Sequence, residues 1–221
     1  MKATVSSMTE NKSPIDVLRR SILAGICIGI GATVYLSCQS NKYIGSFLFG
    51  IGLFLICTYG FNLFTGKVGY AIKNRKQLGL LYYIEVWLGN LIGCAIVSIP
   101  MRLAKPQLFD IASTLVESKM AQSLPQTIIL GMMCGVMMYI AVNTFKISES
   151  PLFKVLAVFL PVAVFILCGF EHSIADMCYM LFGVGLDINA ILKATLYIVV
   201  VSLSNALGAI LFCALSSEKS S

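Results

Sequence analysis

Six long stretches of mainly apolar residues occupy most of this chain of 221 residues. Charged residues make up only 12% of it, and its mean hydropathy is +0.88. Soluble domains carry about 25% charged residues, so we exclude a soluble enzyme, a nucleic-acid-binding protein and a disordered protein. A helix needs about 20 apolar residues to cross a bilayer. We therefore predict an all-α membrane protein with six transmembrane helices at approximately Arg20–Leu36, Tyr43–Ile72, Leu78–Met101, Pro125–Val142, Phe153–Val184 and Ala190–Leu215.

Six spans place both termini on the same side of the membrane. Ten of the sixteen Lys and Arg residues then lie on that side, five lie on the other side, and Lys67 lies within a span. Because basic residues favour the cytoplasmic side, we predict a multi-pass protein of the plasma membrane with cytoplasmic termini. We expect a single channel domain over residues 1–221, with cytoplasmic segments at residues 1–19 and 216–221.

The start of the first helix has a clear capping signal. Ser13 offers a cap side chain, Pro14 suits the first helical position, and Asp16 adds an acid in the first turn. We therefore predict that the helix begins at this point, ahead of the apolar stretch. The segments between the spans are short connectors, except for Arg102–Leu124 between the third and fourth spans, to which we assign no span.

No metal or cofactor site is predicted. The eight cysteines are scattered, without a C-x-x-C pair, and most lie inside apolar stretches. His172 is the only histidine. We interpret the cysteines as small packing residues.

An internal repeat relates the two halves of the chain. The third span contains Leu88–Gly93 and the sixth contains Leu203–Gly208, and both read small-Asn-x-x-Gly. Polar interruptions also correspond, with Phe64–Lys67 in the second span and Gly169–Ser173 in the fifth. Three spans per half give two inverted repeats, and inverted repeats with broken helices are typical of a transport pathway at the bilayer midplane. The alternative is that the small-Asn-x-x-Gly pattern only permits close helix packing.

The fifth-span interruption holds the strongest candidate functional residue. His172 has Glu171 beside it and Asp176 one helical turn later, all flanked by apolar residues. Ionisable residues inside a membrane are costly and are functional by default. A histidine can also donate a hydrogen bond and exchange a proton near neutral pH.

Other polar residues lie near the two interruptions. Thr65 and Ser173 are hydroxyls that either bind a ligand or cap helix ends. Lys67 and Asp176 each follow an interruption, and we hypothesise that they pair, with Glu85 and Glu171 as rival partners for Lys67. The alternative is that Lys67 extends to the cytoplasmic interface.

The residues from the fifth span resemble a known family. Phe159–Phe165 followed by Gly169–Met177 closely resembles the fifth-helix signature of the formate/nitrite transporter family. Leu63–Gly66 resembles the Ω-loop in that family's second helix. Asn90 and Asn205, with their following glycines, fit its third and sixth helices, and the similarity spans roughly residues 14–215.

The resemblance implies an aquaporin-like protomer with broken second and fifth helices, assembled as a homopentamer with one pore in each protomer. It implies passage of small monovalent anions such as formate, nitrite, hydrosulfide, acetate or lactate, often with a proton. If the family's pore residues are placed on the matching positions of this sequence, His172 is the central pore histidine and Thr65 faces it. The expected constriction positions are Phe49, Leu53, Leu63, Phe64, Met138 and Phe165.

This sequence departs from the family pattern at several positions. The family usually has Asn at the position of Asp176, often Asn at that of Lys67, an acid at that of Asn62, and Asn in the fourth span where we align Gly135. These departures leave open an alternative function, a pore for a small neutral or cationic solute.

Two further alternatives are weaker. A water or glycerol pore would be expected to carry an Asn-Pro-Ala pair at its breaks, which this sequence lacks. An intramembrane enzyme is not expected, because adjacent residues such as His172 and Ser173 rarely aim at each other as a base and a nucleophile. We therefore expect proton-linked transport, in which a substrate protonated at His172 crosses as the neutral acid.

Overall fold

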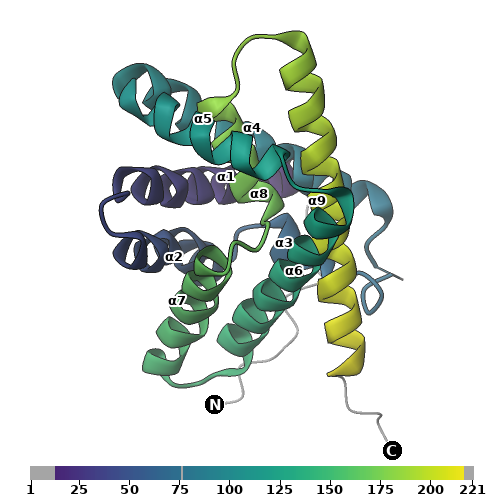
Figure 1. The fold of residues 1–221 in the computed structure, drawn as a ribbon. Helices are drawn as coiled ribbons and strands as arrows, with labels where there is room; N and C mark the ends of the chain where they lie inside the picture. The colour runs from purple at the N-terminus through teal and green to yellow at the C-terminus, as the bar shows by residue number, and fades with distance from the viewer. Residues whose placement is uncertain (1–12, 76, 217–221) are drawn as a thin grey trace, which may run out of the picture.

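The computed structural model describes residues 13–75 and 77–216, and in this part of the chain all regular secondary structure is helical (Figure 1). Five of the described helices, α1, α2, α4, α6 and α9, are long and apolar enough to cross a membrane, and α7 and α8 are shorter apolar helices. Most of the expected N-terminal segment 1–19, and residues 217–221, lie outside the described residues. The helices are α1 (Pro14–Ser37), α2 (Lys42–Tyr59), α3 (Phe64–Val68), α4 (Leu80–Ala104), α5 (Gln107–Met120), α6 (Leu124–Ile147), α7 (Pro151–Leu167), α8 (Ser173–Gly183) and α9 (Ile188–Leu215).

The predicted cap of α1 is confirmed. Ser13 is the N-cap, and its hydroxyl accepts a hydrogen bond from the backbone N–H of Asp16 at 3.3 Å. Pro14 occupies the first helical position. The carboxylate of Asp16 forms ion pairs with Arg19 at 2.6 Å and with Arg20 at 3.2 Å.

Two helix pairs form the scaffold, with α1 against α4 and α6 against α9. Figure 1 shows α9 running alongside α6, with the short helices α3 and α8 in the interior. A Cβ atom added to Gly93 would overlap the carbonyl oxygen of Ile22, and one added to Gly208 would overlap that of Met132. The glycines of the repeated pattern therefore permit close backbone contact in both pairs.

The Arg102–Leu124 segment contains a helix that we did not predict. Helix α5 spans Gln107–Met120 and packs against α8. Its buried face consists of Leu108, Ala112 and Val116, which repeat at helical spacing. The apolar face is too short to suggest a span, which is why we assigned no span to this segment.

The helices break inside the second and fifth apolar stretches. After α2, Gly60 adopts a left-handed conformation with φ 68°, and α3 begins at Phe64. After α7, Gly169 does the same with φ 67°, and α8 begins at Ser173. Our prediction that Phe64–Lys67 forms the first break is wrong, because those residues are helical and the gap lies just before them. Glycine tolerates the left-handed conformation that ends each helix.

Asn90 of α4 satisfies the backbone groups at the first break. Its side-chain oxygen accepts a hydrogen bond from the backbone N–H of Phe64 at 2.8 Å. Its amide nitrogen donates to the carbonyl oxygens of Ser21 and Asn62, both at 2.8 Å. This one buried side chain therefore anchors the start of α3 to α1 and α4.

Asn205 of α9 makes the corresponding bonds at the second break. Its side-chain oxygen accepts from the backbone N–H of Ser173 at 2.9 Å. Its nitrogen donates to the carbonyl oxygens of Gly131 at 2.8 Å and Glu171 at 2.7 Å. The two asparagines of the repeated sequence pattern thus hold the two breaks in the same way.

We predict that Asn205→Ala destabilises the protein strongly. The substitution leaves one buried N–H and two buried carbonyl groups without this partner, and an unsatisfied buried group costs about 1–3 kcal/mol. The midpoint of thermal unfolding of the detergent-solubilised protein measures the effect. Asn189→Ala, at an exposed position of the same helix, is the matched control, and equal midpoints for the two variants would contradict the anchoring role.

Candidate functional site

His172 and Thr65, which are 107 residues apart in the sequence, meet in the interior. His172 is the N-cap of α8, and its Nδ1 accepts a hydrogen bond from the backbone N–H of Ala175 at 3.0 Å. The proton of the neutral ring is therefore on Nε2. Nε2 lies 2.9 Å from Oγ1 of Thr65 on α3, so the ring donates to the threonine hydroxyl. Both residues are almost completely buried.

Aromatic side chains hold the histidine ring from one side. The ring of Phe165 stacks on that of His172 with centroids 5.4 Å apart, and the ring of Phe49 is almost perpendicular to that of Phe165, with centroids 6.0 Å apart. The six residues expected at the constriction are all buried in the hydrophobic core: Phe49, Leu53, Leu63, Phe64, Met138 and Phe165.

Two cavities lie on either side of the Thr65–His172 contact. The first, of about 220 Å³, reaches Leu63 and Gly66, the neighbours of Thr65. The second, of about 70 Å³, is lined by His172 and Phe165. Leu63 and Phe165 thus line one cavity each, whereas the linings do not include the other four expected constriction residues.

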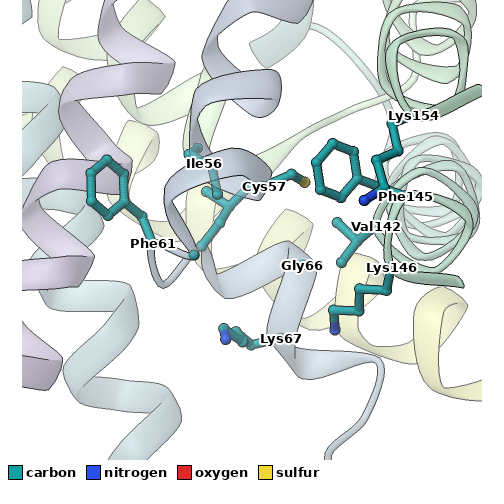
Figure 2. A pocket seen from close by; sticks show the side chains of 11 residues that line it. Ile56, Cys57, Phe61, Gly66, Lys67, Val142, Phe145, Lys146 and Lys154 are labelled. Carbon is teal, nitrogen blue, oxygen red and sulfur yellow. The ribbon is translucent and has the colours of Figure 1, made fainter. Parts of the chain in front are cut away.

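The first cavity, which we call the lysine cavity, combines positive charge with apolar walls (Figure 2). Lys67 of α3, Lys146 of α6 and Lys154 of α7 all line it. The ammonium of Lys146 also lies over the ring of Tyr70, 4.0 Å from the ring centroid. An arrangement of this kind attracts anions and partly removes them from water.

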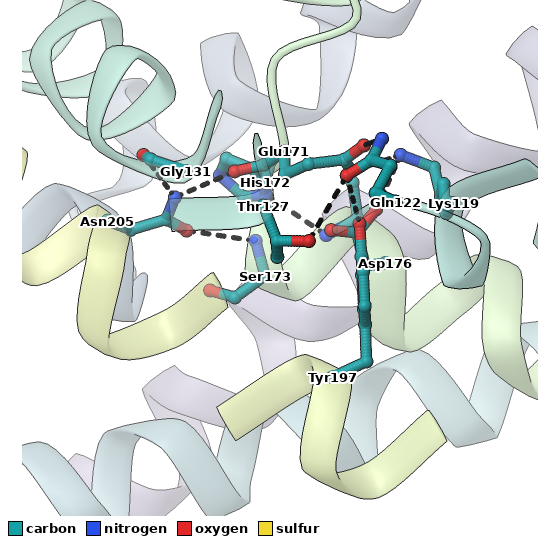
Figure 3. A network of polar contacts seen from close by, with 11 residues as sticks. Lys119, Gln122, Thr127, Gly131, Glu171, His172, Ser173, Asp176, Tyr197 and Asn205 are labelled. Carbon is teal, nitrogen blue, oxygen red and sulfur yellow. Dashed lines mark hydrogen bonds and ion pairs between the residues drawn. The ribbon is translucent and has the colours of Figure 1, made fainter. Parts of the chain in front are cut away.

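The second cavity, which we call the acidic cavity, lies beside a cluster of buried charges (Figure 3). The ammonium of Lys119, near the end of α5, forms an ion pair with Glu171 and lies 3.0 Å from Oδ1 of Asp176. The side chain of Gln122 donates to the other oxygen of Glu171 at 2.7 Å. The side chains of Glu171 and Asp176 are only 2% and 1% exposed.

Our hypothesis that Lys67 pairs with Asp176 is therefore wrong, because Lys119 is the lysine that forms this ion pair. Lys119 lies against Asp176 and also pairs with Glu171, whereas Lys67 lines the lysine cavity. Glu85, another residue that we considered, is partly buried in α4.

Lys119 was not identified from the sequence, because it lies in the Arg102–Leu124 segment and was one of the five basic residues assigned to the outer side of the membrane. A signal was present, since Lys119 follows Leu108, Ala112 and Val116 at helical spacing. A lysine that continues the apolar face of a helix points toward the protein interior, where it needs an anionic partner.

Ser173 and Gly135, which we also singled out from the sequence, have structural roles. The backbone N–H of Ser173 is held by Asn205, and its buried hydroxyl makes no hydrogen bond with any described residue. A Cβ atom on Gly135 would overlap the carbonyl oxygen of Asn205. Gly135 is therefore a helix-packing position, where an asparagine would not fit, and it does not alter the lining of either cavity.

Comparison with known proteins places these features in a family. The sequence model of the family described as "Formate/nitrite transporter" matches residues 2–217. "Formate channel FocB" from Escherichia coli (strain K12) is 27% identical over 194 residues, which cover 79% of this chain and 69% of that protein.

Solved structures share the fold. An "FNT family ion channel" has a TM-score of 0.82 at 23% identity, covering 92% of this chain and 89% of the other. A "Pentameric formate channel with formate bound" has a TM-score of 0.77 at 25% identity, covering 91% and 95%.

We predict that Lys119→Met lowers stability by about 3–5 kcal/mol, because it leaves Glu171 and Asp176 buried without their cation. Thermal unfolding in detergent measures the change. Lys105→Met, which removes an exposed lysine just before α5, should have little effect. A Lys119→Met protein as stable as the Lys105→Met protein would show that Lys119 does not compensate the buried carboxylates.

Proposed function

We propose a transport mechanism for this chain from one premise, that it belongs to the formate/nitrite transporter family. It is accordingly a multi-pass membrane protein of a channel and transporter family. Its substrates are small monovalent anions of weak acids, in the class of formate, nitrite, hydrosulfide, acetate and lactate. The observation that carries this proposal is the buried Thr65–His172 hydrogen bond between two cavities.

The protein crosses the membrane six times in an aquaporin-like arrangement. In this interpretation α2 with α3, and α7 with α8, each form one broken span. The matching roles of Asn90 and Asn205 support two inverted halves. The basic residues of the loops favour cytoplasmic termini in the plasma membrane. The likeness to a pentameric channel supports a homopentamer.

The lysine cavity collects the anion. Lysines from α3, α6 and α7 raise the local concentration of anions in front of Leu63 and Gly66, the neighbours of Thr65. Passing further as a bare anion would be very costly, because the next residues are apolar and buried. The substrate therefore has to become neutral before it crosses.

The Thr65–His172 pair supplies polar contacts at the narrowest point. Because Nε2 of the neutral ring donates to the threonine oxygen, the hydroxyl hydrogen of Thr65 is directed elsewhere and can donate to a substrate oxygen. His172 meanwhile is held in orientation by Ala175 and Phe165. These contacts replace part of the hydration that a small acid loses at this point.

The chemical balance of the cycle is simple. The anion gains one proton, the neutral acid crosses the constriction, and the acid releases the proton on the far side. Anion and proton therefore move together, and the rate should rise as the pH on the side of uptake falls.

The first test is uptake by proteoliposomes of formate, nitrite, hydrosulfide, acetate, lactate and ammonium at an acidic and a neutral pH. We expect the weak-acid anions to enter faster at the acidic pH, and ammonium to enter no faster than in empty liposomes. Selective uptake of ammonium would instead support the alternative, a pore for a cationic or neutral solute.

The second test removes the threonine hydroxyl. Loss of one well-placed hydrogen-bond donor costs about a hundredfold in rate at comparable sites, so Thr65→Val should slow formate uptake by about that factor. Thr65→Ser should keep most of the rate. Thr195→Val, at an exposed position of α9, is the matched control, and an unchanged rate in Thr65→Val would exclude a role for the hydroxyl.

A further inference from the structure

The cluster of buried charges beside the acidic cavity has two carboxyl groups but one ammonium group. Within residues 13–75 and 77–216, Lys119 is the cation that forms ion pairs with Glu171 and Asp176. Two carboxylates and one ammonium leave a formal charge of −1, and all three side chains are largely buried. An uncompensated charge is expensive in a membrane protein interior. One bound proton would make the cluster neutral.

The hydrogen bonds distinguish the two carboxyl groups. Both oxygens of Glu171 accept bonds from nitrogen donors, one from Lys119 and one from Gln122. Both oxygens of Glu171 are therefore already occupied as hydrogen-bond acceptors. Asp176 has the Lys119 ammonium 3.0 Å away, but neither of its oxygens accepts a hydrogen bond of good geometry from a described residue. Asp176 is therefore the carboxyl group that has room for a proton.

Asp176 also faces the space through which a substrate would pass. It lines the acidic cavity together with His172. The volume of about 70 Å³ exceeds the roughly 15 Å³ that one water molecule requires, so the carboxyl group can meet a water or a small anion there.

We propose that Asp176 holds the proton that accompanies each substrate anion and transfers it to an anion that has entered the acidic cavity, before the neutral acid crosses the Thr65–His172 constriction toward the lysine cavity. This inference rests on the transport function proposed above and names the protein group that supplies the proton. The O–H bond of Asp176 breaks as an O–H or S–H bond forms on the substrate, leaving the Asp176 carboxylate and the neutral acid. A hydronium ion from the aqueous side then restores the proton on Asp176.

The neighbouring groups favour this role. Lys119 and Glu171 are the charged residues in contact with the carboxyl group, and His172 is neutral because its Nδ1 accepts a hydrogen bond. The remaining titratable groups near Asp176 are neutral at physiological pH, and they come from α1, α6, α8 and α9: Tyr35, Cys134, Tyr179 and Tyr197. An asparagine, which the family pattern usually has here, could not carry a proton.

A spectroscopic experiment tests directly whether Asp176 carries a proton, and it does not depend on transport activity. Infrared difference spectra of the purified protein, recorded between acidic and alkaline pH, report the carbonyl stretch of a protonated carboxyl group. We expect a band from a buried acid in the unmodified protein that is lost in Asp176→Asn and kept in Glu117→Gln, which changes an exposed acid on α5. A band that persists in Asp176→Asn, or its absence from the unmodified protein, would overturn the proposal.

A transport experiment tests the transfer. In proteoliposomes, we expect Asp176→Asn to lower formate uptake at acidic pH by about a hundredfold, the lower end of the range for loss of a general acid, and to flatten the dependence of the rate on pH. Glu117→Gln should keep the full pH dependence. An Asp176→Asn protein with an unchanged pH profile would overturn proton transfer from Asp176.

These results separate the inference from the function on which it rests. If the unmodified protein carries none of the weak-acid anions, the proposed function fails, whereas the infrared band still reports whether Asp176 holds a proton. A second outcome is that the unmodified protein carries formate at a rate that follows the sodium or ammonium concentration and not the pH. The negative charge of the Glu171–Asp176–Lys119 cluster is then balanced by a bound cation, so the inference about Asp176 fails while the proposed function stands.

Discussion

The structure depends on two buried asparagines that allow helices to end inside the membrane. A bilayer offers no water to the backbone groups that a helix break exposes, so the protein must satisfy them itself. Asn90 and Asn205 each provide one acceptor and two donated bonds at the required places. Without those bonds α3 and α8 would not start where they do, and Thr65 and His172 would not face each other.

The polar pair at the centre is neutral, and the charges lie in or beside the two cavities next to it. The lysine cavity carries positive charge on an apolar wall, whereas the acidic cavity is lined by Asp176 and Lys119, and Glu171 pairs with Lys119 beside it. This separation suits a substrate that changes its own charge on the way. A carboxyl group in the acidic cavity can give a proton to an anion that enters there, and the lysines of the other cavity favour the anion that forms again after the neutral acid has crossed.

Much of this arrangement was predictable from local sequence patterns. The apolar stretches, the Ser13 cap and the paired interruptions follow from composition and spacing. The first break was misplaced because the conformation of Gly60, and not the polar Thr65–Lys67 segment, ends α2. The partner of Asp176 could not be found in the same way, since ion pairing across helices depends on packing. Symmetry between the halves suggested Lys67, but α5 has no counterpart among the described helices of the first half and brings in Lys119.

Helix α5 is also what makes an acid at position 176 tolerable. Two buried carboxylates without Lys119 would repel each other and any incoming anion. With Lys119 and one proton the cluster is neutral, and it can receive an anion. Transfer of that proton to the anion then moves a negative charge from the substrate to Asp176, while the total charge in the cavity stays the same. Because no net charge is created in the apolar interior, the step avoids most of the electrostatic cost that a bare anion would meet.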